Sequence, residues 1–163
     1  MSTFTWEQLQ AEQAAWALYN FGVRHPTQPL RGIIEELGEL EEAVNKSDQE
    51  DAVADCLIFM VDYCSLREIN FRGVLVAGSA PRPTLLAVVG RLCHSDLKLE
   101  QGIRGTREEH LSAISKMLAF IVDYLLDCIE GCSDQDLLHL VETTWSSVRQ
   151  RDFKKFPKNG ESL

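Results

Sequence analysis

The sequence is poor in basic residues, and it offers no signal peptide at its start and no long apolar run. Only 16 lysines and arginines stand against 25 aspartates and glutamates, which leaves a formal net charge of -9 at pH 7. This balance argues against non-specific binding to nucleic acid, because such binding needs an excess of positive charge on the protein. The run from Leu118 to Leu126 is interrupted by Asp123 and is too short to span a bilayer. We therefore expect a cytoplasmic protein that binds neither nucleic acid nor membrane.

The sequence also lacks paired cysteine motifs, and strand-like alternation of apolar and polar residues is short wherever it occurs. The five cysteines form no pair of Cys-x-x-Cys motifs, which argues against a zinc site. The chain of 163 residues is 45% apolar and 25% charged, enough for one compact domain with a real core. We expect a single all-α domain covering residues 1–163.

Apolar residues at helical spacing, together with capping and breaking residues, predict a bundle of about six helices. Thr5 and Gln8 resemble a capping box for the first helix, and Ser133 or Asp134 is expected to cap the last. Residues 70–83 hold two glycines and two prolines and are expected to be the main connection. The tail, 152–163, is basic and then polar and is expected to fray at its end. The predicted helices cover residues 6–20, 29–44, 50–66, 84–101, 107–130 and 136–151.

Two of these segments look alike when offset by 61 positions. Residues 50–63 read EDAVADCLIFMVDY and residues 111–124 read LSAISKMLAFIVDY, so several apolar positions and the closing Val-Asp-Tyr coincide. One interpretation is an internally duplicated helical hairpin, with residues 1–70 as a metal-binding repeat and 84–152 as a degenerate second repeat. Asp51 would then face Ser112 and Asp55 would face Lys116, so the second copy has lost most of its acidic residues. The alternative is that two amphipathic helices share a pattern by chance.

Five acidic residues fall at helical spacing on two consecutive predicted helices. Glu36 and Glu39 are three apart, Glu35 and Glu39 are four apart, and Asp51 and Asp55 are four apart. In an antiparallel hairpin these two faces can meet, where the carboxylates would repel one another. Mg²⁺ or Mn²⁺, which prefer oxygen ligands, would relieve that repulsion. The alternative is a solvated acidic face, but Asp55 lies inside a hydrophobic run, which favours a site.

The segments PLRGIIEELGELEEAV (29–44) and EDAVADCLIFMV (50–61) resemble the MazG-type all-α nucleotide pyrophosphohydrolases. That superfamily also includes dimeric dUTPases, dCTP pyrophosphatases and phosphoribosyl-ATP pyrophosphohydrolases. Its pattern is Glu-x-x-Glu followed by Glu-x-x-Asp. Glu36, Glu39 and Asp55 match this pattern, but Ala52 stands where the second motif has its glutamate. Asp51 is taken as the ligand in its place.

The resemblance implies a Mg²⁺-dependent hydrolase that converts a nucleoside triphosphate to the monophosphate and pyrophosphate. The metal ions, Mg²⁺ or in its place Mn²⁺, would be held by Glu36, Glu39, Asp51 and Asp55. Glu35 or Glu36 would act as base toward a water that attacks the α-phosphorus. Two chains could pair as a homodimer. Which nucleotide is the substrate does not follow from the sequence.

An acidic site that takes a triphosphate also needs cations and, for the base, an aromatic surface. Basic residues gather in the second half of the chain, and Arg104 lies between two glycines that would let a phosphate approach closely. Phe21, in a loop beside Asn20, is a candidate for stacking on a base. Each of these residues alone could equally be ordinary surface. The predicted substrate-binding residues are Phe21, Lys98, Arg104, Arg151 and Lys154, and the further candidate cations are Arg107, Arg149 and Lys155.

Other functions stay open at this stage. Because Ala52 departs from the pattern, the chain could be a non-catalytic helical scaffold or a nucleotide-binding protein with a relic acidic site. A calcium loop over residues 45–51 lacks the central glycine and the proper spacing. A di-iron bundle would need Glu-x-x-His pairs, and the chain offers only Asp136 and His139.

Overall fold

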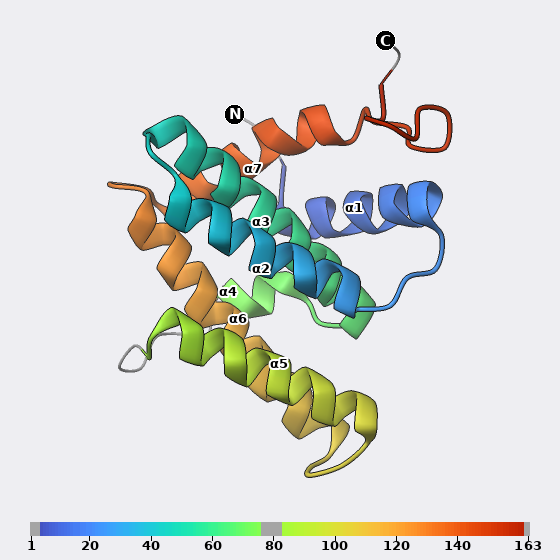
Figure 1. The fold of residues 1–163 in the computed structure, drawn as a ribbon, viewed down its shortest axis with the longest axis vertical. Coiled ribbons are helices and arrows are strands. Elements are labelled where there is room, and N and C mark those ends of the chain that lie inside the picture. The colour runs from blue at the N-terminus through green and yellow to red at the C-terminus, as the bar shows by residue number, and fades with distance from the viewer. Residues whose placement is uncertain (1–3, 76–82, 162–163) are drawn as a thin grey trace.

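The computed structural model describes residues 4–75 and 83–161, and over these ranges the chain is all-helical, as the sequence predicts (Figure 1). The described part contains seven helices and no strand. Their bounds are α1 Trp6–Phe21, α2 Thr27–Glu42, α3 Lys46–Arg67, α4 Phe71–Leu75, α5 Leu85–Gln101, α6 Arg107–Cys128 and α7 Asp134–Val148.

Local capping determines where several helices begin. Thr5, Thr106 and Ser133 each accept a hydrogen bond from the backbone amide three residues later, and the side chain at that position binds back to the cap. These are reciprocal capping boxes, which satisfy amides that the first helical turn leaves without partners. The predicted caps at Thr5 and Ser133 are therefore confirmed.

The start of α3 differs from the prediction. The polar residues 45–49 were expected to interrupt the helical pattern, yet α3 begins at Lys46 because the Asn45 side chain accepts a hydrogen bond from the Asp48 amide at 3.0 Å. Asp51 consequently lies more than a turn inside the helix. The same helical backbone rules out a calcium-binding loop in this segment.

The predicted connection 70–83 contains a short helix that the sequence did not indicate. Gln10 of α1 holds its start: the Gln10 side chain donates to the Ile69 carbonyl at 2.8 Å and accepts from the Phe71 amide at 3.0 Å. Phe71 packs against Trp6 with ring centroids 5.2 Å apart. These long-range contacts form α4, and they cannot be foreseen from spacing. Residues 76–82 of that connection lie outside the described residues.

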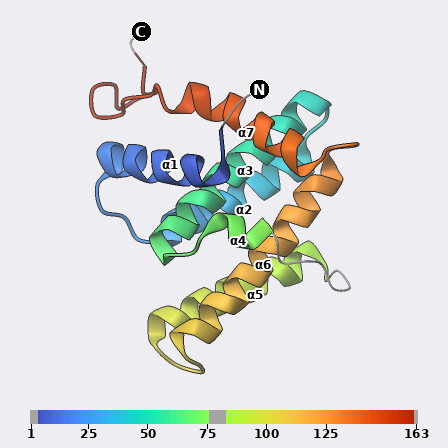
Figure 2. The same ribbon diagram turned by 180° about the vertical axis from the view of Figure 1, so that it is seen from behind.

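Helix α3 is the centre of the molecule, and two helical hairpins dominate the arrangement (Figures 1 and 2). One hairpin pairs α2 with α3 and the other pairs α5 with α6, while α3 also packs against α1, α4, α6 and α7. Helices α3 and α6 both have 22 residues, and their ends are offset by the 61 positions of the sequence comparison. This correspondence supports the duplication, which stays a prediction.

The tail forms a closed loop over most of its described range, and its last residues, 162–163, lie outside the described residues. A tail loop (residues 152–160) is closed by a hydrogen bond from the Asp152 amide to the Gly160 carbonyl at 2.7 Å. It is tied to α1, because Trp16 Nε1 donates to the Arg151 carbonyl and the Phe153 amide donates to Asn20 Oδ1. The loop lies beside the end of α1 in both views (Figures 1 and 2). It therefore forms one wall of the site described below.

Within the described ranges, no helix combines the length and the hydrophobicity that crossing a membrane requires.

Candidate functional site

A cavity of about 310 Å³ opens between α1, α2, α3 and the segment that follows α7. Four residues predicted from the sequence, Phe21, Glu36, Asp55 and Arg151, lie in its wall although they come from four different parts of the chain. The lining residues are Gln13, Trp16, Phe21, Arg24, Glu36, Asp55, Ile58, Phe59, Asp62, Val148, Arg151 and Phe153.

The antiparallel packing of α2 on α3 aligns the two acidic motifs. Gly32 faces Phe59 so closely that a Cβ atom built at Gly32 would lie 2.5 Å from Phe59 Cδ1. One turn along each helix, in opposite directions, this register places Glu36 opposite Asp55. One further turn along each helix, the same register brings the part of α2 that carries Glu39 toward Asp51 on α3. The contact at Gly32 therefore determines which acids meet.

Glu36 and Asp55 form the inner acidic pair. Glu36 is 9% exposed and Asp55 is half-buried. Burial, then the charges of Asp55 and Glu39, raise the pKa of Glu36 from 4.5 to about 8. Burial and the charge of Asp51 raise the pKa of Asp55 from 3.8 to about 6, although Arg151 acts in the opposite direction. Both carboxyls thus lie where negative charge is disfavoured unless a cation joins them.

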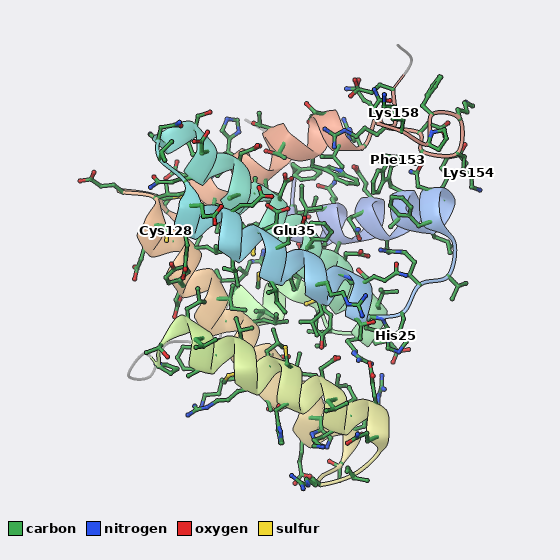
Figure 3. The ribbon with its side chains drawn as sticks, viewed as in Figure 1. His25, Glu35, Cys128, Phe153, Lys154 and Lys158 are labelled. Carbon is green, nitrogen blue, oxygen red and sulfur yellow. The ribbon has the colours of Figure 1, made fainter. Side chains whose placement is uncertain are left out.

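The remaining three acids, Glu35, Glu39 and Asp51, are exposed and surround this pair; Figure 3 shows Glu35 on α2 near the centre of the view. All three raise the pKa of Glu36. Over residues 4–75 and 83–161, no three Asp, Glu, His or Cys side chains are already arranged as metal ligands. The donor set nevertheless consists of carboxylate oxygens alone, which is the chemistry that Mg²⁺ and Mn²⁺ prefer.

Arg151 is the predicted cation that the structure brings to the cavity. It follows α7 directly, its side chain is 42% exposed, and its charge acts on Asp55. Lys154, by contrast, holds its ammonium 4.6 Å from the centre of the Tyr19 ring, and it lies at the outer edge of the tail in Figure 3. Arg149 pairs with Glu12 at 3.1 Å. The sequence identified residues 149–155 as a basic segment, but only the fold shows which of its basic side chains lies at the cavity.

Lys98 and Arg104 are not brought to the cavity within one chain. Lys98 donates a hydrogen bond to Gln101, and Arg104 lies in the α5–α6 connection with a φ of 63°. That connection is at the opposite end of the long axis from α7 and the tail loop (Figures 1 and 2). Arg107 is paired with Glu68 at 2.7 Å. A role of Lys98 and Arg104 in substrate binding stays a prediction.

Three aromatic side chains form the other part of the wall. The Trp16 ring meets Phe21 edge-on at 5.5 Å and Phe153 at 6.2 Å, and the Phe21 and Phe153 centroids are 5.4 Å apart. Trp6, also on α1, is buried in the core and does not line the cavity. Phe153 was missed because its place at the cavity is set by a tertiary contact that the sequence does not indicate. Its position depends on the hydrogen bond between its amide and Asn20.

A buried ion pair at the cavity was also missed. Arg24 donates from both terminal nitrogens to the Asp62 carboxylate, each at 2.5 Å, and the side chains are only 10% and 4% exposed. Asp62 interrupts an apolar run of α3, a signal that a buried aspartate needs a partner. The sequence could not indicate which arginine, because Arg24 lies 38 positions away in the α1–α2 connection.

The structure does not favour the di-iron site that the sequence left as an alternative. His139, the histidine required for a di-iron site, is 80% exposed and its imidazole lies 3.9 Å from Glu142. Comparison with known proteins adds no further constraint: no family model, no curated protein and no solved structure matches the chain.

Proposed function

We propose that this protein is a Mg²⁺-dependent nucleoside triphosphate pyrophosphohydrolase that converts an NTP or dNTP to the monophosphate and pyrophosphate. The observation that carries the proposal is the composition of a single cavity. Its wall combines the inner acidic pair of Glu36 and Asp55, the guanidinium of Arg151, the Arg24–Asp62 ion pair and four aromatic rings. A metal-bound nucleotide presents the matching groups: a divalent cation, a polyphosphate and a planar base.

The carboxylates require a cation before they can accept a phosphate. Glu36, Glu39, Asp51 and Asp55 would hold Mg²⁺, with Mn²⁺ as a substitute, and all four are oxygen donors on two adjacent helices. When bound, the metal supplies positive charge that offsets the charge developing on the phosphoryl oxygens and lowers the pKa of water. Without it, a triphosphate would be repelled by the same acids.

The chain itself contributes a cation, a proton acceptor and a shield from water. Arg151 places a guanidinium beside Asp55, where it can bind phosphate oxygens in a bidentate manner. Glu36 or the exposed Glu35 would take the proton from the attacking water. Without a cation, burial and the neighbouring acids raise the pKa of Glu36 to about 8, so a bound metal would favour the carboxylate form that accepts a proton. The aromatic wall would exclude solvent from the nucleoside side of the α-phosphorus, and pyrophosphate would leave on the other side.

The test is release of pyrophosphate from a panel of canonical NTPs and dNTPs with Mg²⁺, with Mn²⁺ and with EDTA. We expect metal-dependent formation of monophosphate and pyrophosphate, which ³¹P NMR distinguishes from release of phosphate. Glu39→Gln and Asp55→Asn should each lower kcat by about 100-fold or more. Glu41→Gln is the matched control, because this α2 acid acts on Tyr124 rather than on the cluster. Full activity of the Asp55→Asn variant would refute the proposal.

A second candidate function is nucleotide binding without hydrolysis. The observation that favours it is Ala52, which is 4% exposed and offers no ligand at the position where the resembling family has glutamate. Asp51, its exposed neighbour, would have to reach the metal from the next position along the helix. Calorimetry separates the two functions: Mg²⁺-dependent nucleotide binding with no monophosphate formed would favour the second candidate.

A further inference from the structure

Two polar atoms in the wall of the cavity are buried and lack a hydrogen-bond partner within the protein. In the described part of the chain, three buried side-chain nitrogen or oxygen atoms are in this state, namely Gln13 Oε1, Arg24 Nε and Asp123 Oδ2. The residues that carry the first two atoms, Gln13 and Arg24, line this cavity. Buried polar groups are nearly always paired in folded proteins, so an unpaired acceptor and an unpaired donor in one cavity indicate that a ligand completes them.

Neither side chain is free to turn toward solvent. Gln13 is 3% exposed on the inner face of α1. Arg24 is held by Asp62, which accepts hydrogen bonds from both of its terminal nitrogens, so the orientation of Nε is determined by the pair. Two residues of the cavity wall therefore each hold an unpaired group at a fixed position, an acceptor on Gln13 and a donor on Arg24.

The rest of this region favours a flat ligand. Trp16, Phe21 and Phe153 form its aromatic wall, with Phe59 from α3 as a fourth ring in the lining. Aromatic walls bind planar rings well, and a ligand with an adjacent hydrogen-bond donor and acceptor on its edge would also satisfy Gln13 and Arg24. Nucleobases have this combination. A sugar has the polar groups but not the flat apolar faces.

We propose that Gln13 and Arg24 Nε bind the hydrogen-bonding edge of a nucleobase held within the Trp16, Phe21 and Phe153 wall, and that they determine which base is accepted. This inference rests on the proposed function and extends it from the triphosphate to the base. A site built to hydrogen-bond a substrate rejects analogues that leave its polar groups unpaired. Gln13 can offer its amide oxygen or nitrogen, whereas Arg24 Nε offers only a donor.

The test compares the best nucleotide of the panel with ribose 5-triphosphate, which carries the same triphosphate but no base. Gln13→Leu should lower kcat/KM for the nucleotide by about tenfold or more, chiefly through KM, and should reduce the discrimination between bases. The same variant should hydrolyse ribose 5-triphosphate as the unmodified protein does. Gln10→Leu is the matched control: it changes the same residue type on the same helix, but Gln10 binds Ile69 and Phe71 outside the cavity.

The inference is overturned if Gln13→Leu leaves the ranking of bases unchanged, or if it impairs both substrates equally. Phe153→Ala provides a second variant on the tail loop, away from the core. It should raise KM for nucleotides and leave ribose 5-triphosphate unaffected. Equal loss on both substrates would contradict the placement of the base against the aromatic wall.

A binding measurement separates this inference from the proposed hydrolysis. Nucleoside monophosphates are titrated in EDTA, where no metal-dependent turnover occurs, and binding is followed by tryptophan fluorescence, to which Trp16 contributes. Saturable binding that Gln13→Leu weakens supports the base site even if no triphosphate is hydrolysed. Failure of every monophosphate to bind the unmodified protein refutes the base site, whatever the outcome of the hydrolysis assay.

Discussion

At the scale of single residues, Glu36 makes the stability of the metal-free protein depend on pH. Its pKa in the folded state is about 8, above its ordinary 4.5, because of burial and the neighbouring acids Asp55, Glu39, Glu35 and Asp51. The folded protein therefore holds a proton that the unfolded chain releases. The stabilisation is complete below pH 4.5 and is lost as the pH rises through about 8.

Glu36→Gln should remove this dependence, because the amide keeps the shape of the carboxyl without its charge. In EDTA at pH 9 we expect the variant to be more stable than the unmodified protein by on the order of 2 kcal/mol, with the difference vanishing near pH 4.5. Urea denaturation at several pH values measures it. Mg²⁺ should reduce the difference at high pH, because only the carboxylate binds the cation. If the free energy of unfolding changed with pH in the same way in both proteins, the raised pKa would not belong to Glu36.

Residue spacing allowed part of this site to be predicted and not the rest. Glu36, Glu39, Asp51 and Asp55 were identified because their separations are local properties of two helices. Gln13 and Arg24 carry no such signal: Gln13 is one of several glutamines in α1, and Arg24 is an ordinary loop arginine. Their significance arises only when α1 packs on α3 and leaves their polar atoms buried without partners.

At the scale of elements, the approach of α2 to α3 at Gly32 sets the register of the acidic motifs. Gly32→Ala would place a methyl group within 2.5 Å of the Phe59 ring, which also lines the cavity. We expect a loss of about 1–3 kcal/mol in the free energy of unfolding and a weaker affinity for Mg²⁺, because the ring or the helix must shift.

Gly38→Ala is the control for this prediction. It makes the same change on the same helix at a position where a Cβ would meet no atom within 4 Å. An alanine there should leave activity unchanged and raise stability by up to about 1 kcal/mol through its higher helix propensity. Thermal unfolding and calorimetric titration with Mg²⁺ measure both variants. If Gly32→Ala and Gly38→Ala had the same stability and the same affinity for Mg²⁺, the contact at Gly32 would not position the acids.

The elements themselves were predictable where their signals are local. Six helices and the caps at Thr5 and Ser133 follow from periodicity and capping residues. Helix α4 and the tail loop were missed because tertiary hydrogen bonds hold them, from Gln10 to the start of α4 and from Asn20 to Phe153. Asn45 was interpreted as a breaker, although the same side chain is a good helix cap.

At the scale of the whole molecule, the tail loop forms one wall of the cavity, although it lies far in sequence from Glu36 and Asp55 on the other walls. A chain that ends at Arg151 would keep all seven described helices but lose Phe153 and the loop that covers α1. We expect it to fold, to bind Mg²⁺ as before, and to show a KM for nucleotides raised by about tenfold or more. Circular dichroism and steady-state kinetics measure these outcomes.

Lys154→Ala in the full chain is the matched control for the loop deletion, because its ammonium rests on Tyr19 outside the cavity. This variant should keep KM within about twofold of the unmodified protein. A comparable rise of KM in Lys154→Ala would instead place the lysine at the substrate. An unchanged KM in the shortened chain would show that the loop is not part of the substrate site.

The separation of the α5–α6 connection from the cavity gives the last prediction. Arg151 already supplies a cation beside Asp55, whereas Arg104 lies at the other end of the long axis (Figure 1). If one chain contains the complete site, Arg104→Ala should keep kcat/KM within about twofold, whereas Arg151→Ala should lower it by about tenfold or more. A homodimer that shares its sites would behave differently. Arg104→Ala would then be impaired, and mixing it with Glu36→Gln would restore part of the activity, since one site in such a mixed dimer keeps both residues.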